Sequence, residues 1–194
     1  MIQPVCYIRG AMSTKAPPQT QPVMTLLYPR AAIAARVDAL AQEIDRDYAG
    51  RDLLLIGVLK GSFLFIADLA RALSHPADID FVRIASYGSE TRSSGIVEIR
   101  KDLETPIRGR HVLIVEDIVD SGYTLETLCN LLLLREPASL RVCALVDKRA
   151  QRATEAPVDY VGFSLDKGFI VGYGLDHDER FRGLADIYLL QPDA

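Results

Sequence analysis

Hydrophobic residues fall into two patterns that alternate along the chain. Short, continuous apolar runs rich in β-branched residues are typical of strands buried on both faces of a parallel sheet. The strands that these runs predict span residues 53–59, 79–87, 110–117, 140–148 and 159–165. Apolar residues spaced three or four positions apart predict helices over residues 30–48, 63–73 and 125–136. The alternation predicts an α/β fold, with a central twisted, mainly parallel sheet, helices on both faces and ligands at its carboxyl edge.

The beginning of the chain shows neither pattern. Residues 1–27 are rich in proline and polar residues, and they predict a flexible N-terminal tail. The remaining residues, 28–194, contain no internal repeat and no second boundary. A segment of this length suits a single domain with a substantial core.

Composition and charge exclude several classes of partner. The net charge is −4 and the pI is about 5.4, whereas a nucleic-acid-binding face needs clustered basic residues. The apolar runs fall short of the roughly 20 residues that cross a bilayer, and the pattern of an export signal is absent. Cys6, Cys129 and Cys143 are odd in number and widely spaced, which indicates neither a disulfide framework nor a zinc site. We therefore expect a cytoplasmic protein that binds small molecules and neither nucleic acid nor membranes.

Two adjacent carboxylates end one of the expected strands. Glu116 and Asp117 follow the apolar run 112–115, which suits the interior of a parallel sheet. Carboxylates at this place can serve a ribose or metal site, but acidic residues before a helix also occur as plain solubilising and capping groups. The residues that come next favour the ligand site.

The loop after these carboxylates has the composition of a phosphate cradle. Asp120, Ser121, Gly122, Tyr123 and Thr124 form a tight turn before the next helix. Backbone N–H groups at a helix start favour a phosphate, loop hydroxyl groups add donors, and Gly122 lets the backbone approach the ligand. The sequences of a P-loop and of a dinucleotide-binding loop are absent, so this cradle belongs to another class.

The run from Glu116 to Thr124 resembles the phosphoribosyl-pyrophosphate motif of the type I phosphoribosyltransferases. These enzymes transfer ribose 5-phosphate from phosphoribosyl pyrophosphate to a nitrogen base. The resemblance implies that Glu116 and Asp117 hold the ribose hydroxyl groups and that residues 120–124 bind the 5-phosphate. It also implies the fold of that family, in which terminal segments form a small hood beside the central sheet.

Lys60, Gly61 and Ser62 form a second junction between a strand and a helix. Taken alone, such a junction is more often a plain turn. Because the family has a Lys-Gly loop here, the resemblance implies that Lys60 and Gly61 bind pyrophosphate. It further implies a cis peptide bond between Leu59 and Lys60.

The polar segment 86–110 has two interpretations. Residues 93–95 are compatible with the turn of an ordinary exposed hairpin. The resemblance instead matches Ser86 and Tyr87 to the start of a mobile loop that closes over the reacting centre. Closure of such a loop would exclude water from the reaction.

A basic residue, Lys148, follows another expected strand. A lysine there is often part of a solvated turn, but in the hypoxanthine-guanine branch of the family a lysine at this place recognises the exocyclic oxygen of a 6-oxopurine. By the same resemblance, Phe169 stacks on the purine and Ile170 meets the base edge through its backbone. Asp176 lies at the metal and the base, and Arg182 contacts pyrophosphate. Taken singly, Phe169 is more often a core residue, Asp176 a surface loop acid and Arg182 a solvated cation.

The resemblance implies a purine-salvage transferase that converts hypoxanthine or guanine and phosphoribosyl pyrophosphate to IMP or GMP and pyrophosphate. Asp120 is the candidate general base. Glu116, Asp117 and Asp176 are the candidate metal ligands, for Mg²⁺ or for Mn²⁺ in its place. We also expect a homo-oligomer, either a dimer or a tetramer.

Two other functions stay open. A phosphoribosyltransferase for another base, such as xanthine or a pyrimidine, would share the phosphate motif, although the residues around Lys148 and Phe169 argue against it. A regulator that binds phosphoribosyl pyrophosphate without catalysis would need a basic RNA- or DNA-binding face. The net charge does not provide one.

Overall fold

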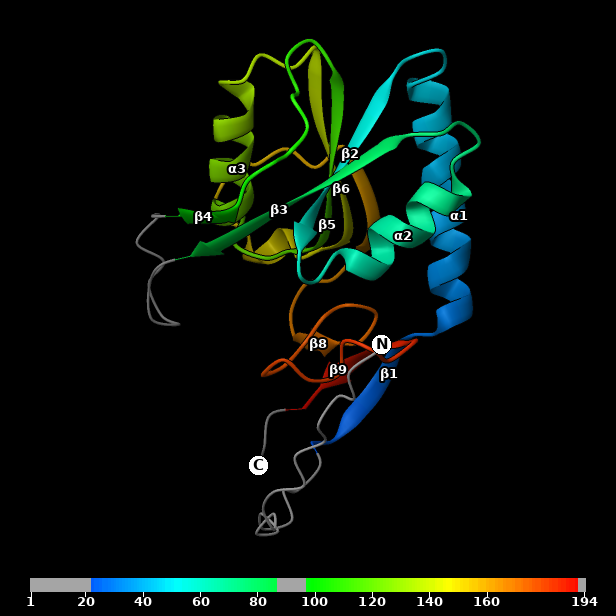
Figure 1. The fold of residues 1–194 in the computed structure, drawn as a ribbon. Coiled ribbons are helices and arrows are strands. Elements are labelled where there is room, and N and C mark those ends of the chain that lie inside the picture. Colours follow the sequence, from blue (N-terminus) through cyan, green and yellow to red (C-terminus); the bar gives the residue numbers. More distant parts are fainter. Residues whose placement is uncertain (1–21, 87–96, 192–194) are drawn as a thin grey trace, which may run out of the picture.

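A computed structural model of the protein describes residues 22–86 and 97–191. These residues form two β-sheets and three α-helices (Figure 1). The larger sheet has six strands in the order β4-β3-β2-β5-β6-β7. The strands are β2 (Leu53–Leu59), β3 (Asp78–Ser86), β4 (Val97–Lys101), β5 (His111–Val119), β6 (Ser139–Asp147) and β7 (Tyr160–Ser164). All neighbours are parallel except β3 and β4, so the sheet is mainly parallel, as predicted.

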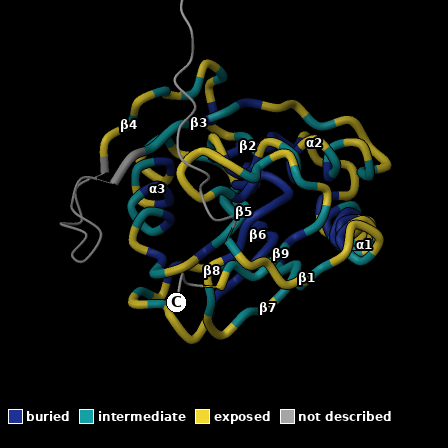
Figure 2. The backbone as a smooth tube through the Cα atoms, turned by 90° about the horizontal axis from the view of Figure 1, so that it is seen from below, coloured by how far each residue is buried: buried dark blue, intermediate teal, exposed yellow. Residues whose placement is uncertain are grey.

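Helices cover both faces of the larger sheet. They are α1 (Arg30–Asp47), α2 (Phe63–Ala72) and α3 (Tyr123–Leu133), and a short 3-10 helix, η1 (Arg149–Gln151), follows β6. Leu113 and Val115 of β5 belong to the core beneath α1 and α2, whereas Val112 and Ile114 belong to the core beneath α3. This alternation follows from the two-residue period of a strand. Figure 2 shows the buried residues gathered at the centre of the molecule, between α1 and α3.

A second, three-stranded antiparallel sheet lies beyond the carboxyl ends of the larger one (Figure 1). It consists of β1 (Met24–Tyr28), β9 (Ile187–Leu190) and β8 (Phe169–Val171), with β9 in the centre. Segments from both ends of the described chain therefore form the expected hood.

The hood corrects the predicted boundary of the N-terminal tail. Residues 24–27, assigned to the tail, belong to β1 and pair with β9. The ring of Tyr28 stacks on Phe163 of the larger sheet, with 4.1 Å between ring centroids. Pairing with a strand more than 150 positions away is invisible to local periodicity, which explains the error. Residues 1–21 of the predicted tail lie outside the described residues.

Most predicted elements agree with the structure to within a few residues. The exceptions are informative, because β5 extends to Val119 and α3 begins at Tyr123. In the polar segment 86–110, β4 pairs antiparallel with β3, and Ser86 lies opposite Val97. Tyr87, which the resemblance matched with Ser86 to the start of the mobile loop, lies outside the described residues. None of the helices in the described ranges is both long enough and apolar enough to cross a membrane.

Candidate active site

The predicted site residues lie along the carboxyl edge of the larger sheet, where it faces the hood. The end of β5, the loops after β2, β5 and β6, and the start of α3 carry the residues of the sheet side. β8 and the segment that follows it carry those of the hood side. The sheet-side residues are Lys60, Gly61, Glu116, Asp117, Asp120, Ser121, Gly122, Tyr123, Thr124 and Lys148. The hood-side residues are Phe169, Ile170, Asp176 and Arg182.

Glu116 and Asp117 lie within β5 and so point to opposite faces of the sheet. Asp117 faces Gly61, where an added Cβ atom would lie 1.8 Å from its Oδ2 atom. Glu116 faces α3, and its charge contributes to a raised pKa of the Cys129 thiol in that helix. The two adjacent carboxylates therefore do not converge on a single point.

Burial raises the pKa of both carboxyl groups. It raises the pKa of Glu116 well above its ordinary value, with a smaller contribution from Asp117. The Oε2 atom of Glu116 is buried and has no hydrogen-bond partner in the part of the chain that the structure describes. Burial raises the pKa of Asp117 to about 6, and its own backbone N–H, that of Ile118 and the charge of Arg182 oppose the rise. A ligand that supplies positive charge or hydroxyl donors would stabilise these carboxylates.

Two glycines bring the sheet side and the hood into backbone contact. A Cβ atom added at Gly174 would lie 2.0 Å from the carbonyl oxygen of Gly61. Gly174 adopts a φ of 100°, a conformation that other residues rarely adopt. The peptide bond between Leu59 and Lys60 is cis, as the resemblance implied. The Lys60-Gly61 loop is thus fixed between β5 and the hood.

The loop from Asp120 to Thr124 leads into α3, as expected for an anion site. Gly122 is the N-cap of α3 with a φ of 87°, and an added Cβ atom there would lie 2.5 Å from Thr154 Oγ1. Gly122 has no side chain that could accept hydrogen bonds from the N–H groups of the first helical turn. These N–H groups are therefore available to a ligand. The backbone N–H of Ala153, in the segment after η1, donates to the carbonyl oxygen of Ser121 and so holds the loop in place.

Lys148 and Asp120 form a direct ion pair across this loop. The Nζ atom of Lys148 donates to Asp120 Oδ2 at 2.9 Å, and the backbone N–H of Lys148 donates to the carbonyl oxygen of Val119. The lysine side chain is 7% exposed and that of the aspartate is 53% exposed. A buried ammonium needs an acceptor, so any change at Asp120 must leave one in place or supply another.

On the hood side, Asp176 and Arg182 are also paired. Arg182 donates to Asp176 Oδ1 at 2.7 Å and to the carbonyl oxygen of Gly174 at 2.8 Å. A third residue, Glu179, accepts from Lys60 Nζ at 2.9 Å and from Arg182 at 3.4 Å. The two cations expected to bind pyrophosphate therefore share one carboxylate partner, which the sequence interpretation did not identify.

The base-side residues differ in exposure. Phe169 lies in the edge strand β8 with its side chain outward, 49% exposed, and its ring meets that of His177 edge-on at 5.3 Å between centroids. Ile170 is buried, and it lies opposite Leu189 of β9 in the sheet register. An exposed aromatic face beside the carboxyl edge is suited to stacking with a planar base.

Comparisons with known proteins identify the family of this chain. Residues 25–178 match the family described as "Phosphoribosyl transferase domain". The chain belongs to this family. A hypoxanthine-guanine phosphoribosyltransferase of Mycobacterium avium is 46% identical to this phosphoribosyltransferase over 196 residues, covering 97% of each chain.

Two solved structures are similar to this phosphoribosyltransferase. A hypoxanthine phosphoribosyltransferase from Staphylococcus aureus has a TM-score of 0.84 and 38% identity, covering 87% of this chain and 91% of that chain. One from Trypanosoma cruzi has a TM-score of 0.83 and 40% identity, covering 91% of this chain and 95% of that chain. The fold is therefore that of the type I phosphoribosyltransferases.

The carboxylates of this phosphoribosyltransferase fit a metal that the substrate helps to hold. Among the described residues, no three His, Cys, Asp or Glu side chains are grouped to hold an ion. Glu116 points toward α3, so it does not share one site with Asp117 and Asp176. The charge of Asp176 contributes to the raised pKa of Asp117, so these two carboxylates interact. Mg²⁺ usually takes one or two carboxylates together with water and phosphate oxygens, which matches this pair.

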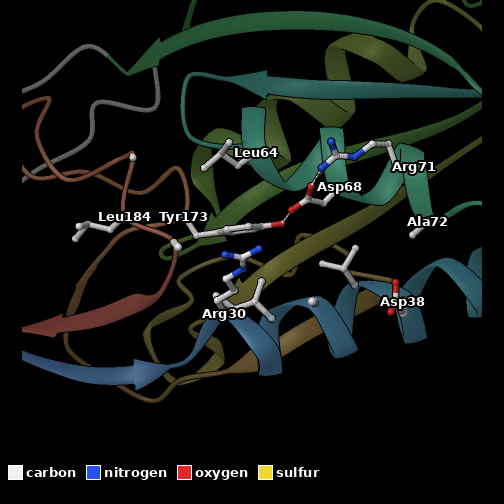
Figure 3. Close-up of a pocket in the computed structure, with 13 residues that line it drawn as sticks. Arg30, Asp38, Leu64, Asp68, Arg71, Ala72, Tyr173 and Leu184 are labelled. Carbon is white, nitrogen blue, oxygen red and sulfur yellow. Dashed lines mark hydrogen bonds and ion pairs between the residues drawn. The ribbon is translucent and has the colours of Figure 1, made fainter.

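Sequence patterns also missed a brace between the hood and α2. Tyr173 is buried at a φ of 48°, and its hydroxyl donates to Asp68 Oδ2 at 2.6 Å (Figure 3). Arg71 approaches the same carboxylate from the other side. These residues line a cavity of about 550 Å³ between α1, α2 and the hood, and none of the predicted site residues lines it. No periodicity in the sequence pointed to this contact, because Tyr173 and Asp68 are 105 positions apart.

Proposed function

We propose that this phosphoribosyltransferase acts in purine salvage and transfers ribose 5-phosphate from phosphoribosyl pyrophosphate to hypoxanthine or guanine. The names of its relatives support the reaction. The observation that carries the proposal is that Lys148, with a buried ammonium, lies at the same edge as the α3 phosphate cradle. A base and a ribose phosphate can therefore meet there.

The sheet-side residues would bind the sugar phosphate. The N–H groups of α3 and the hydroxyl groups of Ser121 and Thr124 would hold the 5-phosphate. Asp117 would accept from one ribose hydroxyl group, and Glu116, on the α3 face of β5, would accept from a different one. Lys60 and Arg182 lie close enough to share one carboxylate, so they could share the oxygens of pyrophosphate. Fixed donors of this kind stabilise the charge that the leaving pyrophosphate acquires.

Asp120 would take the proton that leaves the imidazole ring of the purine when the N-glycosidic bond forms. Its carboxylate is partly exposed at the loop, and its neighbour is the ammonium of Lys148. When the 6-oxygen of the base accepts from Lys148, the carboxylate is released to act as a base. The ion pair thus supports a handover in which the purine replaces Asp120 as the partner of the lysine.

Lys148 and Phe169 would determine which bases are accepted. An ammonium is only a donor, so it complements the acceptor oxygen of a 6-oxopurine but meets another donor on adenine. Phe169 would stack on any purine, because its exposed ring makes no distinction at position 6. Ile170 would present the backbone of an edge strand to the base.

Mg²⁺ is the cofactor we propose, held by Asp117 and Asp176 together with substrate oxygens. Hard oxygen ligands favour Mg²⁺, and Mn²⁺ can use the same ligands. When bound, the ion would neutralise negative charge on the phosphate groups of the substrate and of the leaving pyrophosphate. Activity is expected to vanish in excess chelator and to return with either ion.

A homo-oligomer is also part of the proposal. The Trypanosoma cruzi relative supports it, because the C-terminal region of that protein has a role in its oligomeric state and enzymatic activity. Light scattering at two protein concentrations would distinguish a monomer from a dimer or a tetramer.

One assay tests the proposed reaction. Pyrophosphate formation would be measured with hypoxanthine, guanine, xanthine, adenine, uracil and orotate, each with phosphoribosyl pyrophosphate and Mg²⁺. We expect activity with hypoxanthine or guanine and little with adenine. Preference for xanthine or a pyrimidine would indicate a phosphoribosyltransferase for another base. Absence of turnover with every base would indicate a binding protein without catalysis.

A further inference from the structure

Glu179 occupies the space between the two cations expected to bind pyrophosphate. Its Oε1 atom accepts from Lys60 Nζ at 2.9 Å, and its Oε2 atom accepts from Arg182 at 3.4 Å. Each carboxylate oxygen therefore has its own cationic partner. A carboxylate with this arrangement resembles a phosphate oxygen pair in charge and in spacing.

The position of Glu179 is fixed by its backbone. Its φ is 61°, in the left-handed region, and its backbone N–H donates to Asp176 Oδ2 at 2.9 Å. The neighbouring Asp178 also has a positive φ, of 51°. This turn points the Glu179 side chain toward Lys60 in the loop after β2. Lys60 and Glu179 are 119 positions apart in the sequence.

Arg182 retains unused hydrogen-bonding capacity beside this carboxylate. One of its terminal nitrogens donates to Gly174 and the other pairs with Asp176, but its buried Nε atom has no hydrogen-bond partner among the described residues. The hydrogen bond from Lys60 and its charge hold the pKa of the Glu179 carboxyl below its usual value. The carboxylate is therefore a charged but replaceable partner, since its side chain is 62% exposed.

We propose that Glu179 is an internal anion that occupies the pyrophosphate-binding cations and competes with pyrophosphate for them. The inference rests on the proposed function, which assigns Lys60 and Arg182 to pyrophosphate. Pyrophosphate must displace the Glu179 carboxylate before its oxygens can accept from both Lys60 and Arg182. The loss of the contacts with Glu179 offsets part of the free energy of pyrophosphate binding. Glu179 thereby weakens pyrophosphate binding and speeds the release of pyrophosphate. When pyrophosphate is absent, Lys60 and Arg182 keep Glu179 as a partner.

The test is the affinity for pyrophosphate, measured by calorimetry with Mg²⁺ present. Glu179→Gln keeps the size of the side chain and removes its charge, and we expect the Kd of pyrophosphate to fall by about 3- to 10-fold. Glu179→Asn is a second variant, because asparagine tolerates a positive φ and is too short to reach Lys60. A side chain that merely supports the loop would give weaker binding when altered, whereas a competitor gives tighter binding.

Glu136→Gln is the matched control. Glu136 also has a positive φ, of 56°, its side chain is 65% exposed, and it pairs with an arginine, Arg108. It follows the far end of α3, away from the carboxyl edge. This variant has the same change in net charge, so an equal gain in affinity there would show a general effect of charge and would overturn the proposal.

Arg182→Gln separates the inference from the proposed function. If this variant weakens pyrophosphate binding and neither Glu179 variant strengthens it, Glu179 is not a competitor and only the inference fails. If Arg182→Gln leaves pyrophosphate binding unchanged, the assignment of the cations fails, and with it the proposed role of this side of the site. Tighter binding in both Glu179 variants, weaker binding in Arg182→Gln and no change in Glu136→Gln together support the proposal.

Discussion

The sheet side and the hood side of the active site are held by different kinds of contact. On the sheet side, Gly61 lies so close to Asp117 that no methyl group fits between them. On the hood side, Asp176, Glu179 and Arg182 are joined by ion pairs that reach the surface. Close contacts between backbone and side chain fix a position, whereas exposed ion pairs exchange readily with ligands. The first arrangement suits groups that must not move, and the second suits a product that must leave.

The largest effect is expected at Asp120, on the sheet side. Asp120→Asn keeps an oxygen that can accept from Lys148 but removes the proton acceptor, so turnover should fall by about 10²–10⁴. The KM for phosphoribosyl pyrophosphate should change little. Steady-state kinetics with hypoxanthine checks both values. Undiminished turnover would leave Asp120 only the task of ordering its loop.

A methyl group at Gly61 tests how rigid the sheet side is. Gly61→Ala would place Cβ 1.8 Å from Asp117 Oδ2, so one of the two must move. Misplacement of a binding group by about 1 Å can lower the rate by about 10². Gly183→Ala is the control, because a Cβ atom there meets nothing within 4 Å. Equal kcat/KM values in the two variants would contradict a rigid sheet side.

Lys148→Ala examines the base-reading end of the sheet side. Loss of a hydrogen bond from a charged group should lower kcat/KM for hypoxanthine by about 10- to 100-fold. The disadvantage of adenine should shrink, because the variant also removes the clash between two donors. Kinetics with both bases gives the ratio. A ratio that stays at the wild-type value would show that another group reads position 6.

The smallest expected effect concerns the stability of the sheet side. Because burial raises the pKa of Asp117 to about 6, its folded carboxyl group holds a proton that the unfolded chain has already released. Because of this carboxyl group, the free energy of unfolding falls as pH rises from about 4 to 6. The loss then stays constant above that range. Asp117→Asn should raise the free energy of unfolding by on the order of 1–3 kcal/mol near pH 7, and the gain should vanish near pH 4.

Denaturant unfolding at both pH values, without ligand, checks this. Asp52→Asn is the control, since that carboxylate is 75% exposed at the opposite edge of the sheet. A destabilised Asp117→Asn at neutral pH would mean that its backbone hydrogen bonds outweigh the cost of its burial.

The sequence predicts the larger sheet well because its strands are continuous apolar runs. Leu54, Ile56, Val112 and Ile114 are buried completely, so local hydrophobicity reports their place. The hood is different, since β8 has three residues, β9 has four, and β1 exposes Met24 and Leu26. Such short strands carry too few residues for a period of two to be recognised.

The same limit applies within the active site. Lys148 and Asp120 could be assigned to one edge from the order of strands and loops, but their ion pair depends on side-chain conformations that no local pattern encodes. Glu179 is one charge in the run from Asp176 to Arg182, and its contact with Lys60 joins distant parts of the chain. Only the three-dimensional structure distinguishes its role from the roles of the other charges in this run.

The order of the hood strands has a consequence for synthesis on the ribosome. Strand β9 lies between β1 and β8 and is the last of the described strands to be translated. Domains generally fold as units, so the hood cannot form until β9 has been synthesised, and β1 has no strand partner before then. Lys60 and the loop from Asp120 to Thr124 are therefore synthesised before Phe169 and Arg182, and all of them precede the strand that completes the hood. Premature termination before Ile187 would leave β1 and β8 without the central strand that joins them.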